Sequence, residues 1–122
     1  MANPLADALA AKDNVAIALA LRNDGVVVPV LETERGDPVV RVFGVEGSDK
    51  YSLLLFSSPE AYAAMIPDED NPPSRLYSGA ELLAFIKANI GVLEVVWIDI
   101  AGPNATQAGP GDIMAALELP SA

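Results

Sequence analysis

The N-terminal segment carries the apolar spacing of helices. Asn3 is a favoured N-cap residue and Pro4 is a favoured first helical residue, so we expect a helix to begin there. A second start lies at Asp13, and the Asn-Asp-Gly sequence at residues 23–25 is a typical helix stop. The β-branched residues of segment 15–21 also suit a strand. Its alanines and leucines favour a helix, which is our prediction.

The middle and the later part of the chain contain runs of β-forming residues. Pro29 lies inside the first run, and because proline cannot donate to a strand ladder, it predicts an edge or a bulge there. The first three runs are joined by short polar connections and are expected to form an antiparallel meander. We expect all of the runs to share one mixed sheet, the last of them in a central place. They comprise residues 26–31, 39–45, 51–56 and 92–98.

Serine and proline mark the start of another helix after the third run. Ser58 followed by Pro59 is an N-cap with proline in the first helical position. Ser57 and Glu60 also have the spacing of a capping box, in which two side chains satisfy each other's backbone N–H groups. We expect this helix to end near Met65.

The last third of the chain begins with a short extended segment at residues 75–77. Ser78 and Glu81 then have capping-box spacing and predict a helix. Residues 101–111 are rich in glycine and proline and predict a turn-rich connection, after which Asp112 is expected to cap a final short helix. The predicted fold is α/β (α+β), a mixed sheet with an antiparallel meander flanked by helices, in one domain over residues 1–122.

Composition narrows the classes of function. The chain of 122 residues has 7 Lys plus Arg against 17 Asp plus Glu, a formal net charge of −10, which argues against binding to nucleic acid or anionic membranes. It contains no Cys and no His, which removes disulfides, thiolate and imidazole nucleophile systems and most transition-metal sites. No apolar run reaches the roughly 18 residues of a membrane span. The expected location is the cytoplasm.

A few acidic and aromatic side chains are candidates for a ligand or partner surface. Asp68, Glu69 and Asp70 could ligate a hard cation, but they lack the spacing of an EF-hand and favour a solvated loop. Asp99 follows an apolar strand, where α/β folds tend to bind ligands, although such a residue more often caps the following turn. Trp97 could stack on a ligand, or it could belong to the core.

No residue pattern indicates catalysis or a cofactor. The glycines of residues 102–111 match no phosphate-binding fingerprint, and that loop contains no Lys or Arg. The serines have no histidine base and no lysine at the S-x-x-K spacing. We therefore expect no catalytic, cofactor-binding or metal-binding residues.

The order of these landmarks resembles the N-terminal domain of the SseB family. The resemblance covers nearly the whole chain and rests on residues 26–31, 54–60, 78–83 and 99–103. It implies a bacterial protein with an α/β fold and a presumption of protein binding, and it transfers no enzymatic activity, cofactor or catalytic residue. Some members are associated with a rhodanese-like sulfurtransferase by naming and setting only. The chain ends soon after this first domain, so any role of a C-terminal domain is expected to be absent or supplied by another protein.

Three hypotheses of function follow from the sequence. The first is a non-enzymatic interaction or regulatory module that engages another protein through an acidic face or an apolar groove. The second is a small-molecule-binding domain with a pocket near the end of strand 92–98, lined by Trp97, Asp99 and residues 102–111. The third, an enzyme built on Asp and Glu alone, is the least favoured.

Overall fold

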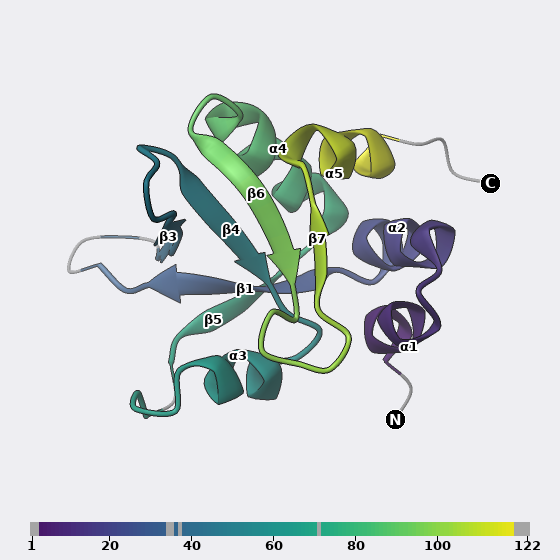
Figure 1. Ribbon diagram of the computed structural model, residues 1–122, viewed down its shortest axis with the longest axis horizontal. Helices are drawn as coiled ribbons and strands as arrows, with labels where there is room; N and C mark the ends of the chain where they lie inside the picture. The colour runs from purple at the N-terminus through teal and green to yellow at the C-terminus, as the bar shows by residue number, and fades with distance from the viewer. Residues whose placement is uncertain (1–2, 34–35, 37, 71, 119–122) are drawn as a thin grey trace.

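The computed structural model describes residues 3–33, 36, 38–70 and 72–118 and shows an α+β fold, which confirms the expected class (Figure 1). The predicted helices over the N-terminal segment and after Ser58, Ser78 and the 101–111 connection are all present. In chain order the elements are α1 (Pro4–Ala11), α2 (Asn14–Asn23), β1 (Val26–Leu31), β2 (Val39–Val40), β3 (Phe43–Gly44), β4 (Tyr51–Leu55), α3 (Pro59–Met65), β5 (Ser74–Tyr77), α4 (Gly79–Asn89), β6 (Leu93–Ile98), β7 (Thr106–Ala108) and α5 (Pro110–Leu117).

The strands form two sheets, so the prediction of one shared sheet is wrong. One sheet has the order β2-β1-β5 and is antiparallel, and the other has the order β3-β4-β6-β7, in which β4 and β6 are parallel. Figure 1 shows β1 and β5 crossing the direction of β4 and β6. Within the described residues, the backbones of the two sheets are linked where Val27 and Phe56 exchange two hydrogen bonds of 3.0 and 2.9 Å.

The segment expected as a single strand at residues 39–45 is divided between these sheets. Its first part, β2, pairs with β1, and its second part, β3, pairs with β4. Each pairing is antiparallel, as the meander prediction required, but the chain changes sheet between them at residues 41–42. The three-strand meander is therefore interrupted.

Pro29 lies in β1, the middle strand of its sheet, and the expectation of an edge or a bulge is wrong. The Pro29 carbonyl accepts a hydrogen bond from the Arg41 backbone N–H at 2.9 Å. In an antiparallel ladder the nitrogen and carbonyl of one residue face the same neighbour. The Pro29 nitrogen therefore faces Arg41, the residue just beyond Val40 at the end of β2, so the missing N–H falls outside the paired residues of β2.

Side chains cap the helices largely as expected. Asn3 accepts a hydrogen bond from the Ala6 N–H at 3.1 Å, and Asp13 caps α2 in the same way. Ser78 and Glu81 form the complete capping box predicted for α4.

Two predicted caps are wrong. Ser58 alone caps α3, because Ser57 binds elsewhere, as described below. Gly109, not Asp112, is the N-cap of α5, since the helix begins one residue later at Pro110 and Asp112 lies in its first turn.

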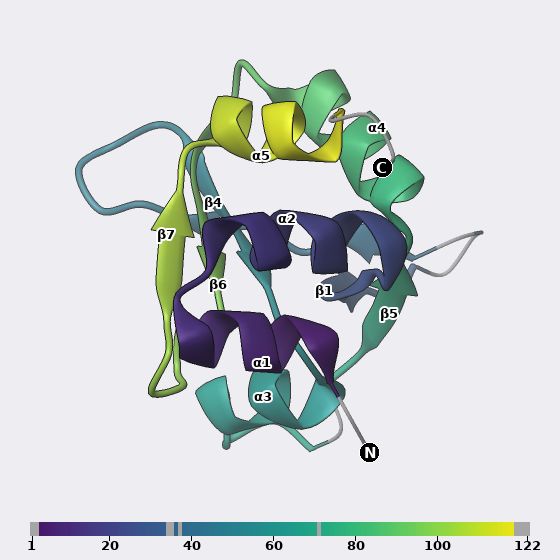
Figure 2. The ribbon, with the colours of Figure 1, turned by 90° about the vertical axis from the view of Figure 1, so that its right-hand side faces the viewer.

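The four-stranded sheet has apolar residues on both faces. Leu53 and Leu55 of β4 point to the larger core cluster, under α1, α2, α4 and α5, while Leu54 points to a smaller cluster with Phe56 and Tyr62. Figure 2 shows α1 and α2 side by side, with α5 next to α2 and α3 at the opposite end. Of the described helices, α3 is the one that packs on the second face, and it does so at one end (Figure 1). None of the described helices is long and apolar enough to cross a membrane.

Candidate functional site

The face of the four-stranded sheet that α3 leaves uncovered contains an open hollow of about 710 Å³, which we call the Trp97 hollow. Trp97 is half-buried, because it packs on one side against the smaller core cluster and on the other lines the hollow. Val95 lies beside it on the same face of β6, as the alternation of side chains along a strand requires. Other lining residues include Val45, Ser52, Glu94, Gln107 and Asp112.

The charge of the Trp97 hollow is negative. Glu94 and Asp112 are the charged residues that line it, and no Lys or Arg does. Glu94 accepts a hydrogen bond of 3.1 Å from the Ser48 hydroxyl, which holds its carboxylate at the rim. A mixed lining in which Trp97 and Val95 lie among polar groups and two carboxylates suits a basic, partly apolar partner.

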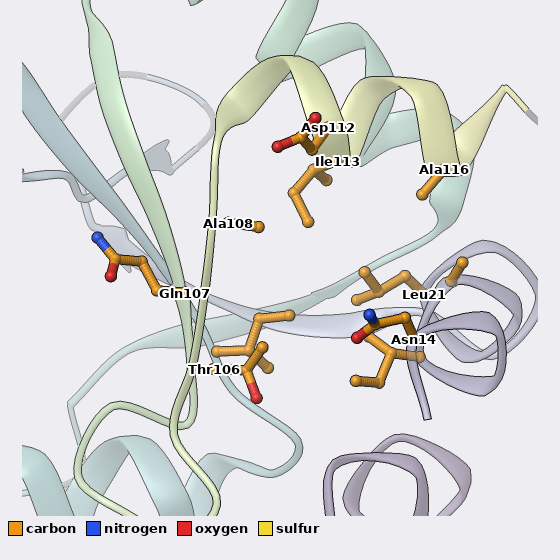
Figure 3. Close-up of a pocket in the computed structure, with 11 residues that line it drawn as sticks. Asn14, Leu21, Thr106, Gln107, Ala108, Asp112, Ile113 and Ala116 are labelled. Carbon is orange, nitrogen blue, oxygen red and sulfur yellow. The ribbon is translucent and has the colours of Figure 1, made fainter. Parts of the chain in front are cut away.

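A second cavity, of about 360 Å³, lies between α2, β7 and α5 (Figure 3). We call it the α2–β7–α5 cavity. Its lining is mostly apolar and includes Ile17, Leu21, Ile98, Ala108, Ile113 and Ala116. Among its polar neighbours, Thr106 already donates its hydroxyl to the Asn104 carbonyl at 3.2 Å, and Asn14 and Asp112 lie at the exposed ends. The cavity therefore offers shape and apolar surface more than polar recognition.

Asp99 has a partner that the sequence did not reveal. Its carboxylate accepts hydrogen bonds from both the backbone N–H and the hydroxyl of Ser57, each at 2.7 Å. Ser57 follows β4 and Asp99 follows β6, so the pair joins the carboxyl ends of two parallel strands. Asn3 adds a bond to the Ser57 carbonyl at 2.9 Å. Asp99 lines neither the Trp97 hollow nor the α2–β7–α5 cavity and ties together the loops at this end of the sheet.

The Ser57–Asp99 pair does not form a nucleophilic site by itself. Activation of a serine hydroxyl requires a base such as histidine or lysine. The chain has no His, and both Asp99 oxygens are occupied by Ser57. The arrangement fixes a loop.

The acidic triplet follows α3, and its members differ in their contacts. Asp68 and Asp70 are exposed, whereas Glu69 forms an ion pair of 2.9 Å with Arg41. Arg41 also donates to the buried Tyr62 hydroxyl at 3.0 Å. The hydrogen bond that Arg41 donates to the Glu69 carboxylate is the main reason why the pKa of Arg41 is raised above its usual value. None of the three acids lines the Trp97 hollow or the α2–β7–α5 cavity.

The structure thus brings Trp97 to a hollow and leaves the four acidic candidates elsewhere. The described residues contain no group of three or more metal-ligating side chains. The sequence reasoning missed β7, which borders both hollows through Gln107 and Ala108. Its signal was weak, a single β-branched residue, Thr106, among the turn-forming residues of the connection.

Together these features define a small α+β domain with an uncovered sheet face. The family model for the SseB protein N-terminal domain matches residues 3–115, and the chain belongs to this family. No curated protein and no solved structure matches the chain.

Proposed function

We propose that the chain is a non-enzymatic protein-interaction or regulatory module of the bacterial cytoplasm that binds a basic partner through the Trp97 hollow. The observation that carries this proposal is the incomplete cover of the four-stranded sheet, which leaves Trp97 and Val95 in an open hollow. Aromatic residues are enriched in the contact surfaces of protein complexes, and a half-buried tryptophan provides contact area at a small cost in conformational entropy.

The negative charge of the chain and of the hollow favours a positively charged partner. The net charge of −10 attracts a basic surface at long range, and Glu94 and Asp112 supply carboxylates at the hollow itself. Asp68 and Asp70 add to the long-range attraction of a basic partner, but they lie outside the hollow and are not expected to contact that partner there. They would change the rate of association more than the affinity.

The test is a double charge reversal at the hollow. The variant Glu94→Lys with Asp112→Lys should lose most of the proteins that the immobilised wild-type chain captures from its native lysate. The matched control is Glu32→Lys with Glu60→Lys, which changes the net charge equally at exposed positions outside the hollow. Glu60 also matches Asp112 as an acid in the first turn of a helix. Equal capture by both variants, measured by quantitative mass spectrometry, would contradict the proposal.

A second candidate function is the binding of a small molecule in the α2–β7–α5 cavity. Its volume of about 360 Å³ falls within the range of small-molecule sites, and it lies beside Ile98, at the end of β6. Trp97 and Asp99 do not line it, unlike the pocket expected from the sequence. A metabolite that raises the melting temperature by several degrees in a thermal-shift screen would favour this function over protein binding.

A further inference from the structure

Strand β7 lies at the edge of its sheet and exposes backbone groups. The Asp99 N–H donates to the Leu55 carbonyl of β4 at 2.9 Å. Because the backbone groups of a strand alternate in direction, those of Trp97, two residues earlier, also point toward β4. Val96 and Ile98 therefore face β7. Their pairs with β7 are the hydrogen-bonded ones, and the pair Trp97↔Gln107 between them is not.

Gln107 is therefore the residue of β7 whose backbone groups do not pair with β6. Its backbone N–H and C=O point away from β6, toward the open edge of the sheet. No hydrogen bond to either group is found among the described residues. An edge with free backbone groups is the template on which an extended peptide adds as a further strand.

The α2–β7–α5 cavity lies directly beside this edge. Three consecutive residues of β7 line the cavity, namely Thr106, Gln107 and Ala108. Because neighbouring side chains of a strand point to opposite faces, their side chains cannot all face it, and the backbone of β7 must border the cavity as well. Figure 3 shows Gln107 and Ala108 on opposite sides of β7. Gln107 and Ala108 also border the Trp97 hollow. A strand added here would direct alternate side chains to the cavity and to the hollow.

Charge selects the occupant of this edge. The residues lining the cavity and the hollow include the carboxylates of Asp112 and Glu94 but no Lys or Arg. A second copy of the chain would bring another net charge of −10 to the same edge and would be repelled. A segment that contains Lys or Arg is attracted.

We propose that β7 binds an extended segment of another protein as a fifth strand, with an apolar side chain in the α2–β7–α5 cavity and Lys or Arg side chains near Asp112 and Glu94. The inference rests on the proposed function, because it specifies how the partner of that module is held. It adds the backbone of Gln107 as the point of attachment.

The test uses random linear dodecapeptides displayed on phage and selected on the purified chain. The selected peptides should share an apolar residue flanked by Lys or Arg. Their affinity, measured by fluorescence anisotropy, should fall about tenfold with Gln107→Pro, which removes the outward N–H and no bond to β6. The matched control, Gln107→Ala, keeps the N–H and should change the affinity by less than about threefold.

A second pair of variants tests the cavity independently of the strand. Ala116→Leu adds bulk inside the cavity and should weaken the same peptides about tenfold or more, because it excludes the apolar side chain. Ala115→Leu makes the same change at an exposed position one residue earlier on α5 and should leave binding unaltered. Thermal unfolding establishes whether each variant is folded. If Gln107→Pro is unfolded, the comparison of Ala116→Leu with Ala115→Leu tests the proposal.

Several results would overturn the inference. These are equal binding by the members of both pairs, selection of acidic peptides, a dimer that forms through β7, and a metabolite that occupies the cavity in place of peptides. The proposed function fails separately, through the reversal of Glu94 and Asp112. If native partners depend on that reversal but are indifferent to Gln107→Pro and Ala116→Leu, the module stands and the added strand does not.

Discussion

Asp99 has an unfavourable backbone conformation and a side chain that makes a tertiary contact with Ser57. Its φ angle of 52° lies in the left-handed region, which costs an L-residue about 1–2 kcal/mol. The two hydrogen bonds from Ser57 to its carboxylate are charge-assisted, and bonds of this kind contribute about 1.5–3 kcal/mol each. The contact with Ser57 therefore offsets the backbone strain.

Substitutions at Asp99 separate these two effects. Asp99→Ala should be the most destabilising, by more than about 2 kcal/mol, because it loses both bonds and keeps the strained backbone. Asp99→Gly should lose about 1 kcal/mol less, since glycine adopts positive φ freely. Asp99→Asn should be the mildest, because asparagine keeps one acceptor oxygen and tolerates this conformation. Urea unfolding measures the series. Equal losses for Ala and Gly would show that the backbone is not strained.

At the scale of elements, the start of α4 abuts the end of α2. A Cβ atom on Gly79 would lie 2.7 Å from the Arg22 carbonyl oxygen and 2.9 Å from its Cα, both of them backbone atoms that cannot rotate away. At Gly111, in the first turn of α5, no atom outside the adjoining residues and the helix backbone lies within 4 Å of the same position. Both glycines lie in the first turn of a helix, and packing requires glycine at Gly79 but not at Gly111.

The same substitution should have opposite effects at these positions. Gly79→Ala should destabilise the protein by about 1–3 kcal/mol, because α4 must move away from α2. Gly111→Ala should stabilise it by about 0.5–1 kcal/mol, since alanine loses less backbone entropy in a helix. The free energy of unfolding in urea measures both. A stabilised Gly79→Ala variant would mean that the two helices do not approach this closely.

The molecule as a whole carries a large excess of negative charge. The ion pairs of the described residues include Arg41–Glu69, in which Arg41 is partly buried, and Lys87–Glu118, in which both side chains are exposed. Solvent-accessible pairs contribute little to stability, and 7 basic residues against 17 acidic ones leave a net charge of −10 whose self-repulsion destabilises the compact state.

Salt should therefore stabilise the fold. Raising NaCl from about 10 mM to about 100 mM shortens the screening length from about 30 Å to about 10 Å. The melting temperature should rise by roughly 2–4 °C, which corresponds to about 0.5–1 kcal/mol for a domain of this size. The variant Asp68→Lys with Asp70→Lys removes part of the negative charge at exposed positions and should show a smaller rise. A melting temperature that falls with salt in calorimetry would mean that favourable ion pairs dominate over repulsion.

The features that depend on neighbouring residues were predictable. Helix starts at Asn3, Asp13, Ser58 and Ser78 follow from caps whose partners lie two or three residues away, and all of them are present. The apolar runs form strands because their β-branched and aliphatic residues favour a buried sheet, whichever strands they pair with. Local chemistry does not determine pairing, however, so the division into two sheets and the place of Pro29 were missed.

The sequence by itself determined the α+β class, the starts of the first four helices and the net negative charge, because these depend on local spacing and on composition. Only the tertiary structure decided that Asp99 binds Ser57, that Glu69 binds Arg41, and that Trp97 lies at an open face. These contacts join residues 28 to 42 positions apart. Their partners depend on how two sheets cross and on how far α3 extends over one of them. Those are properties of packing between distant segments, and no local pattern of residues specifies them.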